Sequence, residues 1–320
     1  MKFKLKGLTA QNEKIELSKP VWFEHLIENF GATIKFKFFF LKPIPYEITQ
    51  LIIQKNEEPP QTFIVDQLEQ LNRKNKPAIF TLTVSSPLNF IWQNYVKPEI
   101  FATLSVNELF EKFCKPFQIQ SINPTLQNNT STQTNFFTTL GMTYWDVVTL
   151  FFKKNFNTTI FINKNNQITT KFKNPNLNPI TTNDPYLTSL KNLTDRTQIL
   201  STLLIQLPDS SANNFNEIAH ENPVAEKLKI NRTKFFKLPK HFTMLPKIGA
   251  QTIIDQHNAS HKIIELQFAK ILEPILWPGT IVELINRDQK LNLCVNSFYT
   301  ALLNNGPITN IKFFMSSLII

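Results

Sequence analysis

The chain of 320 residues contains only six glycines, and this scarcity leaves little room for the glycine-rich loops that cradle phosphates. The sequence has neither a Walker loop nor a dinucleotide-binding fingerprint. It also lacks a serine nucleophile elbow and a His-Glu-x-x-His zinc motif. We therefore expect no enzyme, with no catalytic residue and no bound cofactor.

Cysteine and long apolar runs are scarce as well. Cys114 and Cys294 are the only cysteines, and we expect both to be small buried side chains in a reducing compartment. No run of about 18 apolar residues occurs, so we expect no membrane span. Residues 1–6 alternate lysine with apolar side chains, which predicts a first strand and not a signal peptide. We expect synthesis in the cytoplasm.

Arginine is nearly absent although the net charge is +10. Arg73, Arg196, Arg232 and Arg287 are the only arginines, and all other basic residues are lysines. Arginine is the residue that proteins use for bidentate contacts with phosphate and guanine. Lysine, asparagine, isoleucine and phenylalanine share AT-rich codons, so genome composition explains much of the charge. We expect no specific nucleic-acid recognition.

One group of residues has the spacing of metal ligands. His257, His261 and Glu265 would share a face of a continuous helix. The sequence becomes strand-like at Ile263, which takes Glu265 out of line, so we expect no metal site.

Carboxylates and tryptophans give no stronger signal. Asp184, Asp195 and Glu221 are carboxylates that nothing in the sequence brings together as a hydrolytic pair. The four tryptophans can stack on sugars, but isolated tryptophans more often belong to a core or an interface. They are Trp22, Trp92, Trp145 and Trp277.

What the chain does contain is apolar residues in strand-like patterns. Hydrophobic residues make up 42% and include 29 phenylalanines, enough for two or three domains with their own cores. Alternation at 33–41 predicts a half-buried strand, and short helices are predicted at 24–29 and 66–73. Further strands are predicted at 80–84, 198–207, 281–285, 291–298 and 309–315. We expect a linker at 174–185 and a polar surface excursion at 208–222. An irregular or edge segment is predicted at 235–245, and a helix that leads into a strand at 250–270.

Two similar units stand in the middle of the chain. In the first, the Ser105 hydroxyl can accept from the backbone N–H of Glu108, whose carboxylate reaches back, which is a capping box. The pattern predicts a helix that ends at Lys115-Pro116 and a strand over 117–120. The apolar face of this helix consists of Val106, Leu109, Phe110 and Phe113.

The second unit repeats the design, with Thr143 as the cap and Asp146 three residues later. We expect Trp145 to be buried against the apolar face of the first helix. Between the two units, 123–135 is predicted to be an exposed loop. The helix of the second unit has an apolar face that consists of Tyr144, Val147, Val148 and Phe151, and it ends with Lys153 and Lys154. A strand at 158–162, a turn at 163–166 and a return strand at 167–172 are predicted to follow it.

These patterns predict an α+β fold that is mainly β, with an inserted α/β module. The predicted domains are a first β domain at 1–102, the α/β insert at 103–175, and a second β-rich domain at 176–320 that can share strands with the first.

The order of four segments resembles the baseplate hub proteins of contractile phage tails, the Mu-type hub or late control D family. The resemblance runs from about residue 85 to the end, with a looser fit of the N-terminal barrel. The segments are 104–110 with 115–117 (first helix and the strand after it), 141–147 (second helix), 195–207 (the strand that re-enters the tube domain) and 277–282 with 293–298 (closing strands).

The resemblance implies two tube-like β-barrel domains, a first β-barrel at 1–102 and a second tube-like domain at 176–320, in a structural protein with no turnover. Three copies would form a pseudo-hexameric ring that joins the tail tube to the central spike. The implied partners are further copies of the chain (a homotrimer), the tail tube protein, the central spike protein and other baseplate proteins, in a virion, prophage or other contractile injection system. The alternative from the residues is a multi-domain carbohydrate or cell-wall binding module, which the tryptophans would suit.

Overall fold

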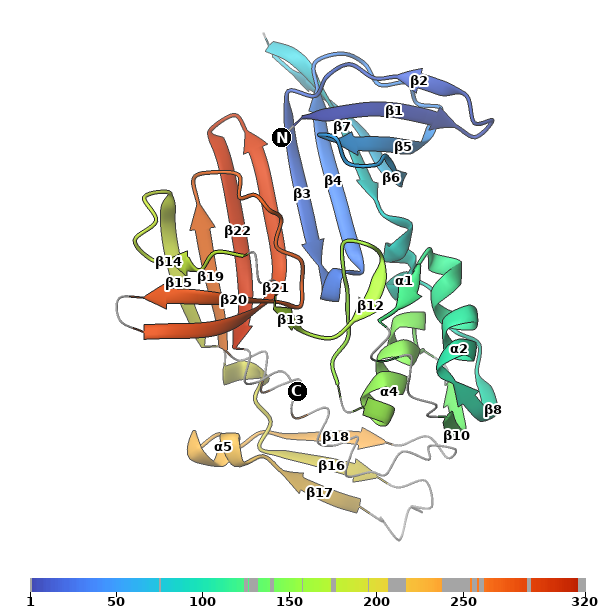
Figure 1. The fold of residues 1–320 in the computed structure, drawn as a ribbon, viewed down its shortest axis with the longest axis vertical. Helices are drawn as coiled ribbons and strands as arrows, with labels where there is room; N and C mark the ends of the chain where they lie inside the picture. The colour runs from blue at the N-terminus through green and yellow to red at the C-terminus, as the bar shows by residue number, and fades with distance from the viewer. Residues whose placement is uncertain are drawn as a thin grey trace.

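A computed structural model describes residues 2–315 except 75, 124–125, 127–131, 139–140, 157, 174–176, 195, 207–216, 238–253, 255–257, 259–261 and 287–288. The fold is mainly β and confirms the predicted class. In Figure 1 the red and orange C-terminal strands stand beside the blue strands β3 and β4, and the helices α1, α2 and α4 lie on the other side of β4.

One sheet of 14 strands joins the N- and C-terminal parts of the chain, in the order β15-β19-β22-β21-β3-β4-β7-β6-β5-β1-β2. Strand β20 also pairs with β21, and the short strands β13 and β14 pair with β20. Its N-terminal strands are β1 (Phe3–Thr9), β2 (Lys14–Glu16), β3 (Trp22–Glu28), β4 (Thr33–Phe40), β5 (Ile48–Lys55), β6 (Gln61–Arg73) and β7 (Lys76–Ser85). Its C-terminal strands are β13 (Phe172–Lys173), β14 (Ile180–Thr181), β15 (Leu187–Thr194), β19 (Lys262–Phe268), β20 (Thr280–Asn286), β21 (Gln289–Leu303) and β22 (Gly306–Met315).

The N- and C-terminal strands meet at β3 and β21. These strands are antiparallel, and Thr300 of β21 lies opposite His25 of β3. The strands predicted at 33–41 and 80–84 are confirmed as β4 and β7, and those at 281–285, 291–298 and 309–315 as β20 to β22. The division into 1–102, 103–175 and 176–320 stays a prediction.

The short helices predicted at 24–29 and 66–73 are wrong. Residues 24–28 belong to β3, and 66–73 belong to β6. In β3 buried and half-buried side chains alternate strictly, and Phe23, His25 and Ile27 point inward. Period-two burial is the property of a strand, and pairing with distant strands overrides the local helical pattern.

The first unit of the insert keeps its predicted cap. Ser105 N donates to Glu108 Oε2 at 2.8 Å, and Glu108 N donates to Ser105 Oγ at 3.2 Å. The helix is α2 (Val106–Leu109) continued by a π turn (Phe110–Cys114). It does not end at Lys115-Pro116, because a 3-10 turn (Lys115–Phe117) follows, where proline fits the first turn.

The strand predicted at 117–120 is also wrong. Gln118 has a φ of 63°, a left-handed conformation that ends the helix, and the strand comes later as β9 (Ser121–Ile122). The loop predicted at 123–135 is wrong from Thr132 on, since β10 (Thr132–Thr138) pairs with β8 (Glu99–Ser105). Residues 124–125 and 127–131 of that prediction lie outside the described residues.

The second unit follows its prediction closely. Asp146 N donates to Thr143 Oγ1 at 3.1 Å and Thr143 N donates to Asp146 Oδ2 at 2.8 Å, at the start of α4 (Tyr144–Phe156). The turn at 163–166 leads from β11 (Phe161–Ile162) to β12 (Gln167–Thr169), which also pairs with β9. The predicted strands are longer than the observed ones, and Phe172 instead joins β20 in the large sheet.

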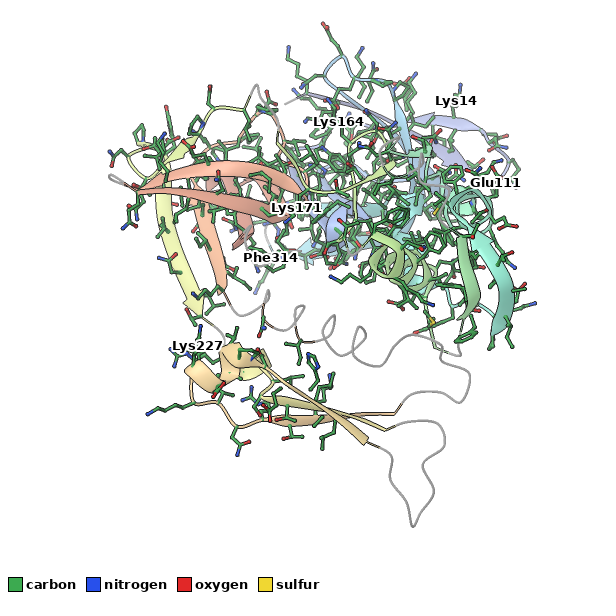
Figure 2. All side chains as sticks on the ribbon, turned by 60° about the horizontal axis from the view of Figure 1, so that its bottom comes forward. Lys14, Glu111, Lys164, Lys171, Lys227 and Phe314 are labelled. Carbon is green, nitrogen blue, oxygen red and sulfur yellow. The ribbon has the colours of Figure 1, made fainter. Side chains whose placement is uncertain are left out.

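A small sheet stands apart from the rest. Its strands are β17 (Glu217–Glu221), β16 (Thr202–Gln206) and β18 (Thr233–Lys237), and α5 (Pro223–Lys227) lies beside them. Figure 2 shows its side chains gathered away from those of the large sheet, with Lys227 on α5. The predicted strand at 198–207 therefore forms, as β16, but its predicted return to the tube domain is wrong because it pairs only with β17 and β18.

Four further predictions are met in part. The segment at 174–185 is no plain linker, because β14 pairs with β20. The excursion at 208–222 contains β17, while 207–216 lies outside the described residues. The segment at 235–245 begins as the end of β18, an edge strand as predicted, and 238–253 is likewise not described. At 250–270 the strand is confirmed as β19, whereas most of the preceding helix prediction falls on undescribed residues.

Phenylalanine rings fill the core of the N-terminal strands. The ring centroid of Phe3 in β1 lies 4.9 Å from that of Phe23 and 5.3 Å from that of Phe38. The centroids of Phe36 and of Phe63 in β6 are 5.2 Å apart. This core continues into the insert through Trp145, which is only 1% exposed. The remaining described elements are the turns Asn29–Gly31, Pro87–Asn89 and Arg196–Gln198 and the helix α1 (Phe90–Gln93).

Candidate functional site

The described residues hold no group of three His, Cys, Asp or Glu side chains that could bind a metal ion, and of the three residues with ligand-like spacing only Glu265 is among them. His257 and His261 lie outside the described part of the chain. Glu265 is in strand β19, as expected. Its carboxylate forms ion pairs with Lys312 Nζ at 3.2 Å and with Lys191 Nζ at 3.7 Å. Glu265 therefore has the role of a cross-strand ion-pair partner.

Asp184 and Glu221, the two of the three loose carboxylates that the structure describes, lie in different sheets or their connections and share no ion-pair partner. Asp184 accepts from Lys270 Nζ at 2.7 Å and from Tyr186 N at 2.9 Å, and the bond to Lys270 lowers the pKa of Asp184. Glu221 belongs to the small sheet, and Asp195 is not described. No hydrolytic geometry is present among these described groups.

The tryptophans divide between core and surface. The rings of Trp92 and Trp145 stack with their centroids 5.7 Å apart. The Phe30 ring stacks on both of them, with centroid distances of 6.4 Å. Trp145 is buried as predicted, and its ring partners come from α1 and the turn after β3. Trp145 belongs to one buried cluster with Leu109 and Phe113 of the first helix, and the Tyr144 ring centroid also lies 5.9 Å from that of Phe113.

Trp22 lies on the outer surface of the large sheet. With Phe39 and Lys37 it lines an open groove of about 450 Å³, whose polar side chains are Glu69, Asn304 and Asn305. The Trp22 and Phe39 rings meet edge-on at 6.3 Å. Trp277 instead lines a different and larger cavity.

Both cysteines are free and buried, as predicted. Burial raises the pKa of the Cys114 thiol far above its usual range and that of Cys294 to about 12. A thiol that keeps its proton is neither a nucleophile nor a metal ligand.

The large sheet has open edges among its described strands. Among the described strands, β15 pairs only with β19, and β2 at the other end pairs only with β1. The part of β6 beyond Ile64 likewise pairs only with β7 among these strands. Most side chains of β15 and of this part of β6 are exposed or half-buried. Unpaired N–H and C=O groups along such edges are templates for pairing with another chain.

A cavity of about 760 Å³ opens where three parts of the chain meet. Strands β3 to β6 form its inner wall, the turn 163–165 and Phe172 belong to the insert, and residues 273–277 come from the segment before β20. Lys164, labelled in Figure 2, belongs to that turn. His25 lines the inner wall and stacks on Phe36 at 4.1 Å.

Sequence patterns do not indicate this cavity, because its residues are far apart in the chain. His25 and Lys55 come from β3 and β5, which are joined only through other strands of the sheet. The single available signal was His25 itself, an isolated histidine in an alternating apolar pattern.

No family model matches the chain, and no curated protein matches its sequence. Solved structures do match. The tail protein from Neisseria meningitidis MC58 has a TM-score of 0.71 at 12% identity, over 100% of this chain and 98% of that one. The 43 kDa tail protein of prophage MuSo2 from Shewanella oneidensis has a TM-score of 0.70 at 12% identity, over all of both chains. A type VI secretion component of E. coli, c3393, has a TM-score of 0.55 at 8% identity, over 98% of this chain and 76% of that one.

These likenesses confirm the resemblance to phage tail proteins at the level of the fold. The chain has the fold of a tail protein over its whole length. Among the residues that the structure describes, no helix is long and apolar enough to cross a membrane.

Proposed function

We propose that this protein is the structural hub of a phage-tail or tail-like baseplate, where three copies form a ring between the tail tube and the central spike. The proposal places it in the virion or particle after synthesis in the cytoplasm. Its partners are further copies of itself, the tail tube protein, the spike protein and other baseplate proteins. It has no catalytic role.

One observation carries the proposal: a single continuous sheet with the tail-protein fold ends in open edges on both sides. An exposed edge is a liability in an isolated monomer, and neighbouring copies in a ring would cover it. A chain with two different open edges can pair head to tail, and such contacts close into a ring when the rotation permits. Each interface should bury more than about 1,000 Å².

Reconstitution tests the proposal. The purified chain, mixed with a tail tube protein and a spike protein from the same particle, should form a complex with the ring between the two, as seen by electron microscopy. Substituting proline at Leu190 in β15, which interrupts that edge, should abolish the ring, whereas Lys42→Pro in the exposed turn after β4 should leave it intact. A complex in which tube and spike join without this chain would overturn the proposal.

A binding module remains the second candidate, and the outer groove favours it. Trp22 and Phe39 offer aromatic surface for a sugar, and Glu69, Asn304 and Asn305 offer hydrogen bonds at its rim. Tight glycan binding that Trp22→Ala abolishes, by a chain that stays monomeric, would support this candidate instead of the hub.

A further inference from the structure

The inner wall of the large cavity contains a buried polar atom without a partner. His25 is only 3% exposed, and its Nδ1 has no hydrogen-bond partner in the structure. A buried polar group without a partner costs free energy, so an isolated imidazole at this place calls for an explanation. The faces of the ring are satisfied, because it stacks parallel to Phe36.

Lys55 is a second nitrogen group that lines this cavity. It is half-buried and makes no ion pair with any described residue. Burial lowers the pKa of Lys55, and its charge contributes to lowering the pKa of His25. The inner wall thus brings together a nitrogen base and an ammonium group that disfavour each other's positive charge.

The other charged groups lie at the mouth. Glu58, Lys164 and Glu273 also line the cavity, and all three are exposed. Water screens them, so their opposite charges have little influence on the inner wall. The two glutamates raise the pKa of Lys55 by less than burial lowers it.

The remaining wall is apolar and aromatic. Phe36, Phe63 and Trp277 line the cavity, whose volume falls in the usual range of small-molecule sites. We propose that this cavity binds an organic carboxylate, whose anionic group lies between His25 and Lys55 and whose apolar body packs on the aromatic wall. A carboxylate accepts from both an imidazole N–H and an ammonium group, so one ligand group supplies the partner that each side chain lacks.

This site is independent of the hub proposal, and it links three parts of the chain. A bound ligand would contact β3 and β5 of the sheet, the turn of the insert at Lys164 and the segment at Trp277. Occupancy should therefore stabilise these parts against one another. The carboxylate can belong to a free small acid or to the C-terminus of a partner chain, since both carry the same group.

Calorimetric titration of the full chain with benzoate tests the proposal, with benzamide as the neutral probe of equal shape. Benzoate should bind and should shift the His25 imidazole resonance, and benzamide should bind at least tenfold less tightly. Lys55→Met and His25→Phe should each weaken benzoate binding at least tenfold. Lys37→Met, a lysine of the same sheet that lines the outer groove, should leave it unchanged.

N-acetyl-phenylalanine, compared with its amide, distinguishes the two sources. Binding of the acid at least tenfold more tightly than benzoate assigns the site to a chain terminus, and weaker binding assigns it to a free small acid. Absence of benzoate binding at millimolar concentration to a folded protein would overturn the proposal. Equal binding of benzoate and benzamide, or unchanged affinity in both variants, would overturn it as well.

Discussion

His25 is a residue whose burial controls how stability depends on pH. Burial, with the charge of Lys55, lowers its pKa from 6.5 to about 3. In the unfolded chain the imidazole takes up a proton below pH 6.5, and in the folded protein it does so only near pH 3. The unfolded state therefore binds more protons in this window, and the free energy of unfolding falls as the pH is lowered through it.

We predict that His25→Phe removes this part of the pH dependence. The wild type should lose up to about 1.4 kcal/mol of stability per pH unit between pH 6 and pH 4 because of His25 alone. Denaturant unfolding at several pH values measures the effect. Parallel curves for wild type and variant would show that His25 does not remain neutral in the fold.

Trp145 tests the packing of the insert at the same scale. Its side chain is 1% exposed and stacks on Trp92 and Phe30, so Trp145→Ala should cost about 3–5 kcal/mol as a large-to-small core change. Trp22→Ala, at the partly exposed outer groove, should cost less than half as much. Thermal and denaturant unfolding measure both, and equal losses would contradict the described packing.

At the scale of elements, the insert is held against the large sheet by close backbone contacts. Gly31, at the end of the turn after β3, has a φ of +87°, and a Cβ there would meet the carbonyl oxygen of Ile162 in β11. Gly279, before β20, approaches the ring of Phe161, to which a Cβ would come within 2.6 Å. Two of the six glycines in the chain thus allow the large sheet to contact the short strand β11 of the insert.

We predict that Gly31→Ala is much more damaging than Gly141→Ala. Both glycines have a positive φ, of +87° and +89°, so both alanines carry about 1 kcal/mol of backbone strain. Gly141 has open space around it, whereas at Gly31 the added carbon overlaps backbone, which should cost about 1–3 kcal/mol more. Equal melting temperatures of the two variants would show that sheet and insert do not touch here.

Local signals predicted these elements well, and long-range pairing explains the failures. The caps at Ser105 and Thr143 depend on residues three apart, and both were predicted correctly. The segment at 24–29 was misassigned because its strand character comes from pairing with β4 and β21. The cavity could not be predicted for the same reason, because only long-range strand pairing brings His25 and Lys55 to one cavity.

At the scale of the whole molecule, we predict that the net positive charge gives the protein only a weak affinity for DNA. Arginine is nearly absent, so any DNA affinity should be independent of sequence and should fall steeply with salt, because counterion release is its source. Fluorescence anisotropy with several duplexes at rising salt measures this. Binding of one sequence 10³-fold more tightly than the others would place the chain among specific DNA-binding proteins.

The central claim is that copies of this chain cover each other's sheet edges in a ring. Light scattering across a range of concentrations, alone and with the tail tube protein, tests it most directly. The account predicts a particle with three times the mass of one chain, either at once or on the tube template, and loss of that particle when β15 is interrupted at Leu190. A chain that stays monomeric at every concentration and on the template would contradict the account.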